Sequence, residues 1–127
     1  MEGHTTMKYP CIHQEEGVLS VEFAPESAQA TRKPLKMVLD FGSLGDVLGI
    51  EIMNLTLEAG EQALEHISQV VADTGDGTRY GYDDESDSFY LRVQTGNSLN
   101  QESVDGLAIC DEEGRITALS AEWPQSP

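Results

Sequence analysis

Residues 38–52 read VLDFGSLGDVLGIEI and carry the clearest structural signal in the chain. A two-residue period places alternate side chains on opposite faces of a β-sheet. The glycines Gly42 and Gly45 suit a tight reversal of the chain between two strands. The stretch therefore predicts an antiparallel hairpin whose inward face is apolar on both sides of the turn: Met37, Leu39 and Phe41 before it, and Leu48, Ile50 and Ile52 after it.

A related pattern returns at residues 107–121, which read LAICDEEGRITALSA. Its turn glycine, Gly114, lies 69 positions after Gly45, and Ile116 takes the place of Val47. A repeat of this length is evidence about the architecture of the fold. It indicates that the chain is built from two copies of a small β unit.

The segments around the first hairpin add a strand and a helix. Residues 17–23, GVLSVEF, alternate as a strand does, and residues 24–34 form a polar connection that ends at Pro34. Residues 56–72 favour a single amphipathic helix, because apolar side chains recur at helical spacing. The stripe consists of Leu57, Leu64, Ile67 and Val71.

The second half repeats the strand pattern. Residues 78–82 and 88–94 alternate on either side of an acidic turn, and Trp123 extends the inward face of the last strand. We therefore predict an α+β fold: two related antiparallel β units joined by one amphipathic helix. The expected boundaries are a loosely ordered N-terminal arm at 1–16, a single domain at 17–123 made of a β repeat at 17–53, a helix at 56–72 and a β repeat at 78–123, and a tail at 124–127.

The charge of the chain is its most unusual property. It has 23 Asp and Glu against 7 Lys and Arg, a formal net charge of −16 and a pI near 4.2. Nucleic acids and anionic membranes bind proteins through basic side chains. The one basic group, Arg32, Lys33 and Lys36, is small, so we expect neither as a partner. The charge favours solubility, and alternatively it steers the domain toward a basic partner.

The cellular location and the pairing state of the cysteines are inferred from features that the sequence does not contain. Residues 1–6, MEGHTT, have neither the basic region nor the apolar run of a secretory signal. No stretch approaches the ~20 apolar residues of a membrane helix. Two cysteines, Cys11 and Cys110, are too few for a disulfide framework and are expected to be unpaired. We therefore expect a cytoplasmic protein.

Two stretches of the second half carry a resemblance to a known family: YDDESDSFYLR at 82–92 and DEEGRI at 111–116. They resemble the short bacterial domains of domain-of-unknown-function family 2283, whose pattern is Tyr-Asp-x-Glu-x-Asp-x-x-Tyr-Ile/Leu-Arg, a polar gap, and Asp-x-x-Gly-Arg before a strand ending Gly-Ile-Glu-Ile. The first half keeps Asp40-Phe41 and the closing GIEI of 49–52, and it lacks the Tyr-Asp pair.

The resemblance covers residues 79–123 well and residues 17–53 weakly. It implies a tandem copy with a degenerate first half, a compact β-rich fold, and a loose association with small toxin–antitoxin-like gene pairs. The family carries no assigned reaction, so the resemblance implies no catalytic residue.

Catalytic patterns are absent from the sequence itself. There is no Gly-x-Ser-x-Gly, no His-Glu-x-x-His and no phosphate loop, so we expect no cofactor and favour a non-enzymatic protein over an enzyme. His66 is interpreted as a surface or boundary histidine. The candidate ligand site is a cleft between the two repeats near Tyr82, Tyr90 and Arg92, where Arg92 would contact an anion or, alternatively, a carboxylate on a neighbouring strand.

The acidic stretch 73–87 is the candidate cation site, with Asp83, Glu85 and Asp87 as ligands. Its order of acids does not match an EF-hand. The favoured alternative is that Asp83 and Asp87 accept backbone N–H bonds at a turn. His4, Cys11 and His13 match no zinc spacing.

Three functions remain open on the sequence alone. The first is an acidic, non-enzymatic protein-interaction module that binds a basic protein or a second copy of itself. The second is a domain that binds a small molecule or metal between the two repeats. The third is an antitoxin-like partner of a small basic toxin.

Overall fold

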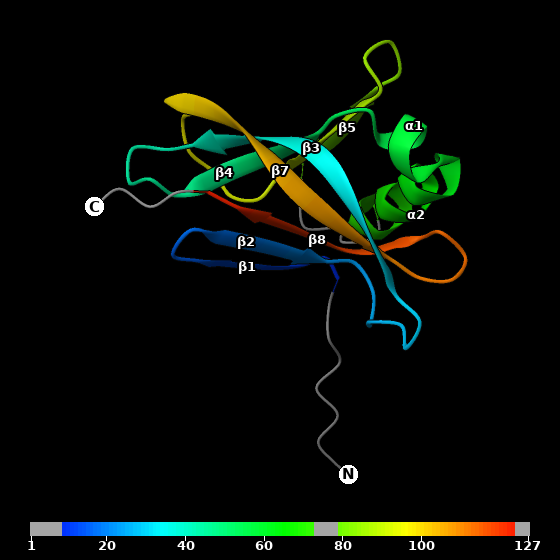
Figure 1. The fold of residues 1–127 in the computed structure, drawn as a ribbon. Coiled ribbons are helices and arrows are strands. Elements are labelled where there is room, and N and C mark those ends of the chain that lie inside the picture. Colours follow the sequence, from blue (N-terminus) through cyan, green and yellow to red (C-terminus); the bar gives the residue numbers. More distant parts are fainter. Residues whose placement is uncertain (1–8, 73–78, 124–127) are drawn as a thin grey trace.

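A computed structural model of the chain describes residues 9–72 and 79–123. Within these residues, eight strands form one antiparallel sheet and two helices lie beside it, as Figure 1 shows. The α+β class is thus confirmed in its broad form. The strands are β1 (Cys11–Glu15), β2 (Val18–Glu22), β3 (Thr31–Phe41), β4 (Val47–Ile52), β5 (Tyr80–Asp83), β6 (Ser88–Arg92), β7 (Asn100–Cys110) and β8 (Ile116–Glu122). The helices are α1 (Leu55–Ala59) and α2 (Glu61–Ala72).

The strand order places the two long strands at the centre of the sheet. It runs β1-β2-β8-β7-β3-β4-β6-β5. β3 and β7 pair along their whole length of 11 residues each. Lys36 lies opposite Asp105 at the midpoint of this pairing, and the two side chains form an ion pair of 2.5 Å. Each central strand then carries a partner on its other side, β4 on β3 and β8 on β7.

Both predicted hairpins are present, and they share their irregularities. The β3–β4 pairing shifts between Asp40 and Phe41, and the β7–β8 pairing shifts between Ile109 and Cys110. Each of these positions is 69 residues from its counterpart. Each hairpin turns on a glycine of positive φ (Gly45 and Gly114), a backbone conformation that side chains disfavour.

The sheet is strongly curled, which brings its distant strands near each other. In Figure 1 the strands β1, β2 and β8 lie below β3, β4 and β7. One side chain joins the two sides: Gln14 on β1 accepts a bond from the Val47 amide at 2.6 Å and donates to the Val47 carbonyl at 3.2 Å. These bonds, together with one from the Gln94 side chain to the Val47 carbonyl at 2.9 Å, satisfy backbone groups at the start of β4.

The inside of the curl holds the core, and α2 packs against it through Ala63, Ile67 and Val71. Met37 is fully buried and lies over Gly106, where an added Cβ would come within a contact distance of the Met37 sulfur that no real carbon occupies. The expected place of Trp123 is confirmed, because its ring meets Phe41 edge to face at 5.5 Å.

The predicted single helix is two helices. Gly60 has φ 90° and separates α1 from α2. The break changes the helical phase, so Leu57, the first residue of the predicted apolar stripe, does not face the core. Leu57 is 77% exposed, whereas Leu55 is fully buried.

Two boundaries also differ from the expectation. β1 lies inside the segment expected to be a loosely ordered arm at 1–16, while residues 1–8 and the expected tail 124–127 lie outside the described residues. β3 begins at Thr31, so Pro34 lies within a strand. Proline fits there because β3 pairs at that point only with β7; its pairing with β4 begins at Met37.

Neither of the two helices described in 9–72 and 79–123 has the length and apolar content needed to cross a membrane. Both cysteines are free thiols, as expected.

We expect Gly106→Ala to lower the free energy of unfolding by about 1–3 kcal/mol, because the new methyl group overpacks the core against Met37 and the Ser120 carbonyl. Gly81→Ala is the matched control, since an added Cβ there meets nothing within 4 Å. Urea unfolding of both variants measures the difference. Equal stabilities would contradict this description of the central pair.

Candidate functional site

Asp87 is the most heavily hydrogen-bonded of the predicted site residues, and it holds the start of α1. Its carbonyl oxygen accepts the Leu55 amide at 3.0 Å. Its carboxylate accepts the Thr56 amide at 3.0 Å and the Leu57 amide at 2.9 Å. The residue before the helix, Asn54, has a left-handed backbone and makes no side-chain cap. A residue 31 positions away therefore supplies the cap that the helix lacks locally.

Two hydroxyl groups complete the Asp87 environment. The Tyr82 hydroxyl donates to Asp87 Oδ1 at 2.6 Å, and the Thr56 hydroxyl donates to the same oxygen at 2.9 Å. Burial alone would raise the pKa of Asp87, but these donors and the two helix amides outweigh it and hold the pKa at about 2. The same hydrogen bond to Asp87 raises the pKa of Tyr82, and burial adds to that rise.

This arrangement separates the residues predicted to bind a cation. The Asp87 carboxylate already accepts four donors. Asp83 accepts the Glu85 amide at 3.0 Å, which is the turn role that the sequence favoured, and the Glu85 side chain is exposed. Among the described residues, Asp83, Glu85 and Asp87 do not form a group whose ligand atoms converge.

The residues predicted to bind a small molecule lie on two faces of the sheet. Tyr82 is paired with Phe89 and shares its inward face, whereas Tyr90 and Arg92 alternate with the buried Phe89 and Leu91 and project outward. The cleft expected between the repeats is therefore not lined by all three. Arg92 donates to the backbone: Nε bonds the Gln94 carbonyl at 3.1 Å and Nη2 bonds the Gly96 carbonyl.

A second aspartate, Asp111, organises the β7–β8 turn. Its Oδ1 accepts the amides of Glu113 at 3.0 Å and Arg115 at 2.9 Å, and its Oδ2 accepts Arg115 Nε at 2.9 Å. Burial would raise the pKa of Asp111, but the hydrogen bonds from Arg115 and Glu113 lower it. The Asp-x-x-Gly-Arg motif of this sequence is thus a turn built around one carboxylate, with Gly114 at the positive φ.

A polar hollow of about 550 Å³ lies where this turn faces α2. Burial lowers the pKa of His66 on α2, and the nearby Arg115 lowers it further against an opposing effect of Asp111. The imidazole is therefore neutral at neutral pH, and its Nε2 has no hydrogen-bond partner among the described residues. The described residues that line the hollow are Gln62, Glu65, His66, Gln69, Glu113 and Arg115, and none of them is a serine, cysteine, threonine or lysine.

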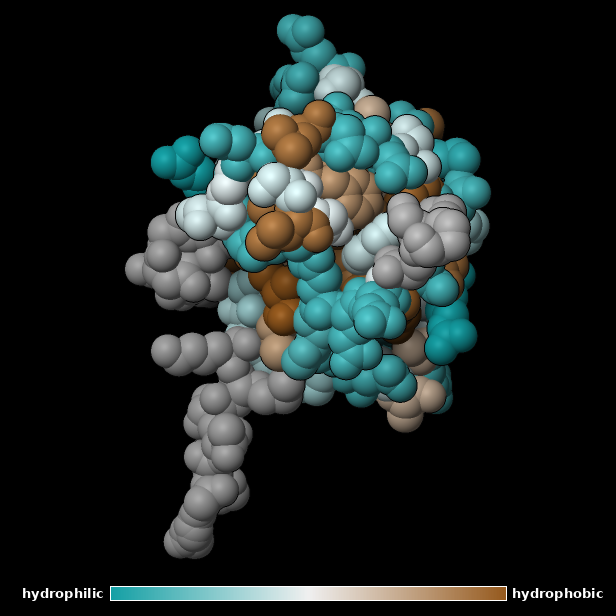
Figure 2. Space-filling view, turned by 90° about the vertical axis from the view of Figure 1, so that its left-hand side faces the viewer, coloured by the Kyte–Doolittle hydropathy of each residue, from teal (hydrophilic) through white to brown (hydrophobic). Residues whose placement is uncertain are grey.

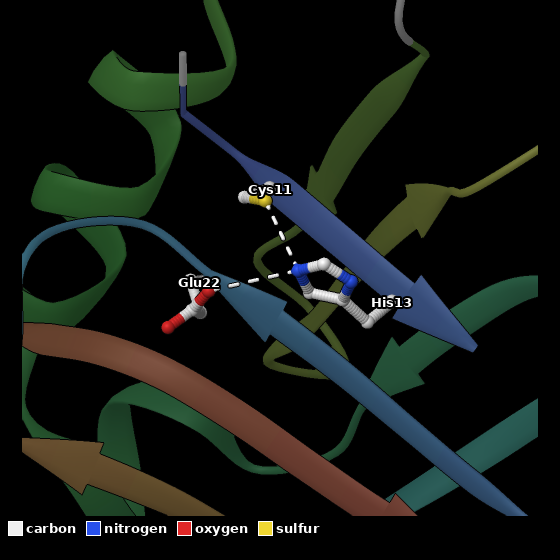
Figure 3. A group of neighbouring side chains, drawn as sticks. All are labelled: Cys11, His13 and Glu22. Atoms are coloured by element: carbon white, nitrogen blue, oxygen red, sulfur yellow. Dashed lines mark hydrogen bonds and ion pairs between the residues drawn. The ribbon is translucent and has the colours of Figure 1, made fainter. Parts of the chain in front are cut away.

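Figure 3 shows a third group, on the outer face of β1 and β2. The Cys11 sulfur lies 3.3 Å from His13 Nε2, and a Glu22 carboxylate oxygen lies 4.0 Å from the same nitrogen. All three ligand atoms are within 4.8 Å of one another. Within the described residues this is the one group of three or more His, Cys, Asp or Glu side chains that could hold a metal ion.

Sequence reasoning missed this group for a definite reason. Cys11 and His13 match no zinc spacing within their own segment, and Glu22 comes from the next strand. Recognising β1 as a strand, with Cys11 and His13 on one face, was the signal that could have found it.

Comparisons with models of protein families, with curated proteins and with solved structures returned no match to this chain. The resemblance to domain-of-unknown-function family 2283 therefore stays a prediction.

Asp87→Asn should lower the free energy of unfolding by about 1–3 kcal/mol at pH 7, because one acceptor oxygen becomes an amide donor that faces another donor, and the hydrogen bonds to a charged carboxylate are lost. The folded-state pKa of about 2 lies below the ordinary 3.8, so the carboxylate's contribution is full above pH 3.8 and is lost as the pH falls through 2. The difference between wild type and variant should therefore shrink over that interval. Urea unfolding at a series of pH values measures it.

Asp84→Asn is the control for this experiment. Asp84 lies in the same turn, is exposed and receives no hydrogen bond from a described residue. It should leave the stability and its pH dependence unchanged. A difference between Asp87→Asn and wild type that stays constant down to pH 2 would rule out the proposed role of the charged carboxylate.

Proposed function

We propose that this domain is a non-enzymatic interaction module that binds a protein with a basic surface. The supporting observation is how few of its carboxylates are neutralised internally. The described residues include 20 Asp and Glu side chains and 6 Lys and Arg side chains. Among them, only Asp105, Asp111 and Glu113 lie within 4.0 Å of a lysine or arginine nitrogen.

Two basic side chains are directed to backbone oxygens instead. Lys33 donates to the Glu58 carbonyl at 2.8 Å, and Arg92 donates to the carbonyls of Gln94 and Gly96. These contacts satisfy the donors of the two cations without pairing them with carboxylates. Most carboxylates are left facing solvent, where their summed field attracts a positively charged partner.

The turn between β5 and β6 is the acidic segment that we infer to be closest to the partner. It projects from the body of the domain at the top of Figure 1. Asp83, Asp84 and Glu85 follow one another there, and all three are exposed. The Asp87 carboxylate is not part of this acidic surface, because it accepts the backbone amides at the start of α1.

The surface at the end of the sheet supports recognition by charge. Figure 2 looks at the end that carries the β1–β2 and β3–β4 turns, and apolar residues show there as small groups among hydrophilic ones. Leu44 in the β3–β4 turn is 90% exposed. Such groups add contact area, while the charge sets the kind of partner.

Self-association is the weaker alternative. β1 and β5 are the outer strands of the sheet and offer unpaired edges. Two copies would each bring a net charge of −16, and this repulsion opposes pairing. A small basic toxin is one partner that fits the charge argument. The small-molecule alternative has less support, because Tyr82 lies on the opposite face from Tyr90 and Arg92.

We also infer that the two hairpins are related units. Three features support this: the 69-residue spacing of their bulges, their matching turn glycines, and the central pairing of Lys36 with Asp105, which are themselves 69 positions apart. An antiparallel pair centred on equivalent residues has an approximate twofold axis at that point.

Capture on the immobilised full chain from a lysate of the source cells tests the function. We expect the recovered proteins to be basic and to be released as salt rises, because screening weakens exposed charge pairs. Substituting Asp83→Asn, Asp84→Asn and Glu85→Gln together should weaken capture several-fold, given about 0.2–1 kcal/mol for each exposed ion pair lost. Recovery of neutral or acidic proteins only, unchanged by salt, would contradict the proposal.

The matched control changes the same number of charges on the helices: Glu58→Gln, Glu61→Gln and Glu65→Gln, all exposed. If both triple variants weaken capture equally, the partner responds to the total charge and the β5–β6 turn has no special place. A larger effect of the turn variant locates the contact there.

A further inference from the structure

We propose that Cys11, His13 and Glu22 form a binding site for one divalent transition-metal ion of the zinc class. The site lies on the outer face of the β1–β2 ribbon and is separate from the acidic turn. It does not depend on the proposed interaction function.

The backbone places the three side chains together. Cys11 and His13 are two residues apart on β1 and therefore project from the same face. Glu22 lies directly opposite Cys11 on β2, so its side chain shares that face. Cys11 and His13 are neighbours on one strand, Cys11 and Glu22 are direct cross-strand neighbours, and His13 and Glu22 are diagonal neighbours. These three positions are close enough for their ligand atoms to meet.

The same nitrogen of His13 faces both other ligands. Nε2 lies 3.3 Å from the Cys11 sulfur and 4.0 Å from the Glu22 oxygen, as the dashed lines of Figure 3 show. Bond lengths of ~2.3 Å to sulfur and ~2.0–2.2 Å to nitrogen and oxygen in a tetrahedral zinc site separate neighbouring ligand atoms by roughly 3.4–3.6 Å. The Cys11–His13 distance of 3.3 Å differs from this spacing by a few tenths of an ångström and the His13–Glu22 distance of 4.0 Å by about half an ångström, while the Cys11 and Glu22 ligand atoms lie within 4.8 Å of each other. Rotation of these partly exposed side chains would bring the three atoms to it.

The identity of the donor atoms selects the class of metal. Calcium and magnesium prefer oxygen ligands, whereas thiolate and imidazole favour zinc and its neighbours. A thiolate and a carboxylate together balance the two positive charges of the ion. The net charge of −16 further raises the local concentration of cations at the surface.

The ribbon that carries the site is held to the rest of the sheet from its inner face. Ile12 packs against the core, and Gln14 bonds both backbone groups of Val47. The ligands on the outer face are therefore presented by a fixed backbone, so that little ordering is required when the ion binds. Three protein ligands leave a fourth tetrahedral position for water.

Cobalt titration of the untagged full-length protein under reducing conditions tests the proposal. Co²⁺ takes zinc sites and reports its ligands, because a bound thiolate gives a charge-transfer band in the near ultraviolet and four-coordination gives strong visible bands. We expect one Co²⁺ per chain with both signatures, and displacement of the cobalt spectrum by Zn²⁺. A spectrum without the thiolate band would overturn the site.

Substitutions then assign each ligand. Cys11→Ser should abolish the charge-transfer band, and His13→Gln and Glu22→Gln should each weaken binding by about tenfold or more. All three side chains project outward, so far-ultraviolet circular dichroism and the melting temperature without metal should not change. This readout distinguishes a lost ligand from a lost fold.

Two control variants each remove a side chain of the same chemical type that lies outside the site. Glu15→Gln removes one carboxylate from the same face of β1, two residues beyond His13, and Cys110→Ala removes the buried thiol of β7. Both should bind cobalt as the wild type does. Binding that survives in Cys11→Ser and Glu22→Gln, or that is lost equally in Glu15→Gln, would overturn the proposal in favour of unspecific attraction by the acidic surface.

Discussion

The pairing of β3 with β7 is the constraint on which the other elements depend. These two 11-residue strands meet in antiparallel register around Lys36 and Asp105, and each carries one further ladder outward. The remaining strands are added to these ladders, so the connection between the two halves of the chain is made at the middle of the sheet. Curling of this sheet then creates the enclosed face that α2 covers.

The two halves exchange their outer hairpins across this centre. β1 and β2, which precede β3 in the chain, pair with β8, whereas β5 and β6 pair with β4. Each half of the sheet therefore contains strands from both halves of the chain. Separating the first four strands from the last four would remove the β2–β8, β3–β7 and β4–β6 pairings, which explains why the chain forms one sheet rather than two small ones.

The carboxylates of this acidic chain have distinct roles. Asp87 and Asp111 accept amide donors at a helix start and at a turn, and those hydrogen bonds lower both pKa values. The larger group is exposed and unpaired, and we propose that it attracts a basic partner. Glu22 belongs to neither set, because it lies beside a thiol and an imidazole on the outer face of the sheet. The same residue type thus stabilises the fold, charges the surface and completes a candidate metal site.

The sequence by itself determined the two hairpins, the inward face of most strands and the acidic charge, because side-chain alternation and turn glycines are local properties. Only the tertiary structure decided which side chains meet. The capping of α1 by Asp87 and the meeting of Cys11 and His13 with Glu22 both depend on contacts between segments distant in the chain or on neighbouring strands. Alternation gives the face of a side chain, whereas its neighbours on that face are fixed by strand order and register.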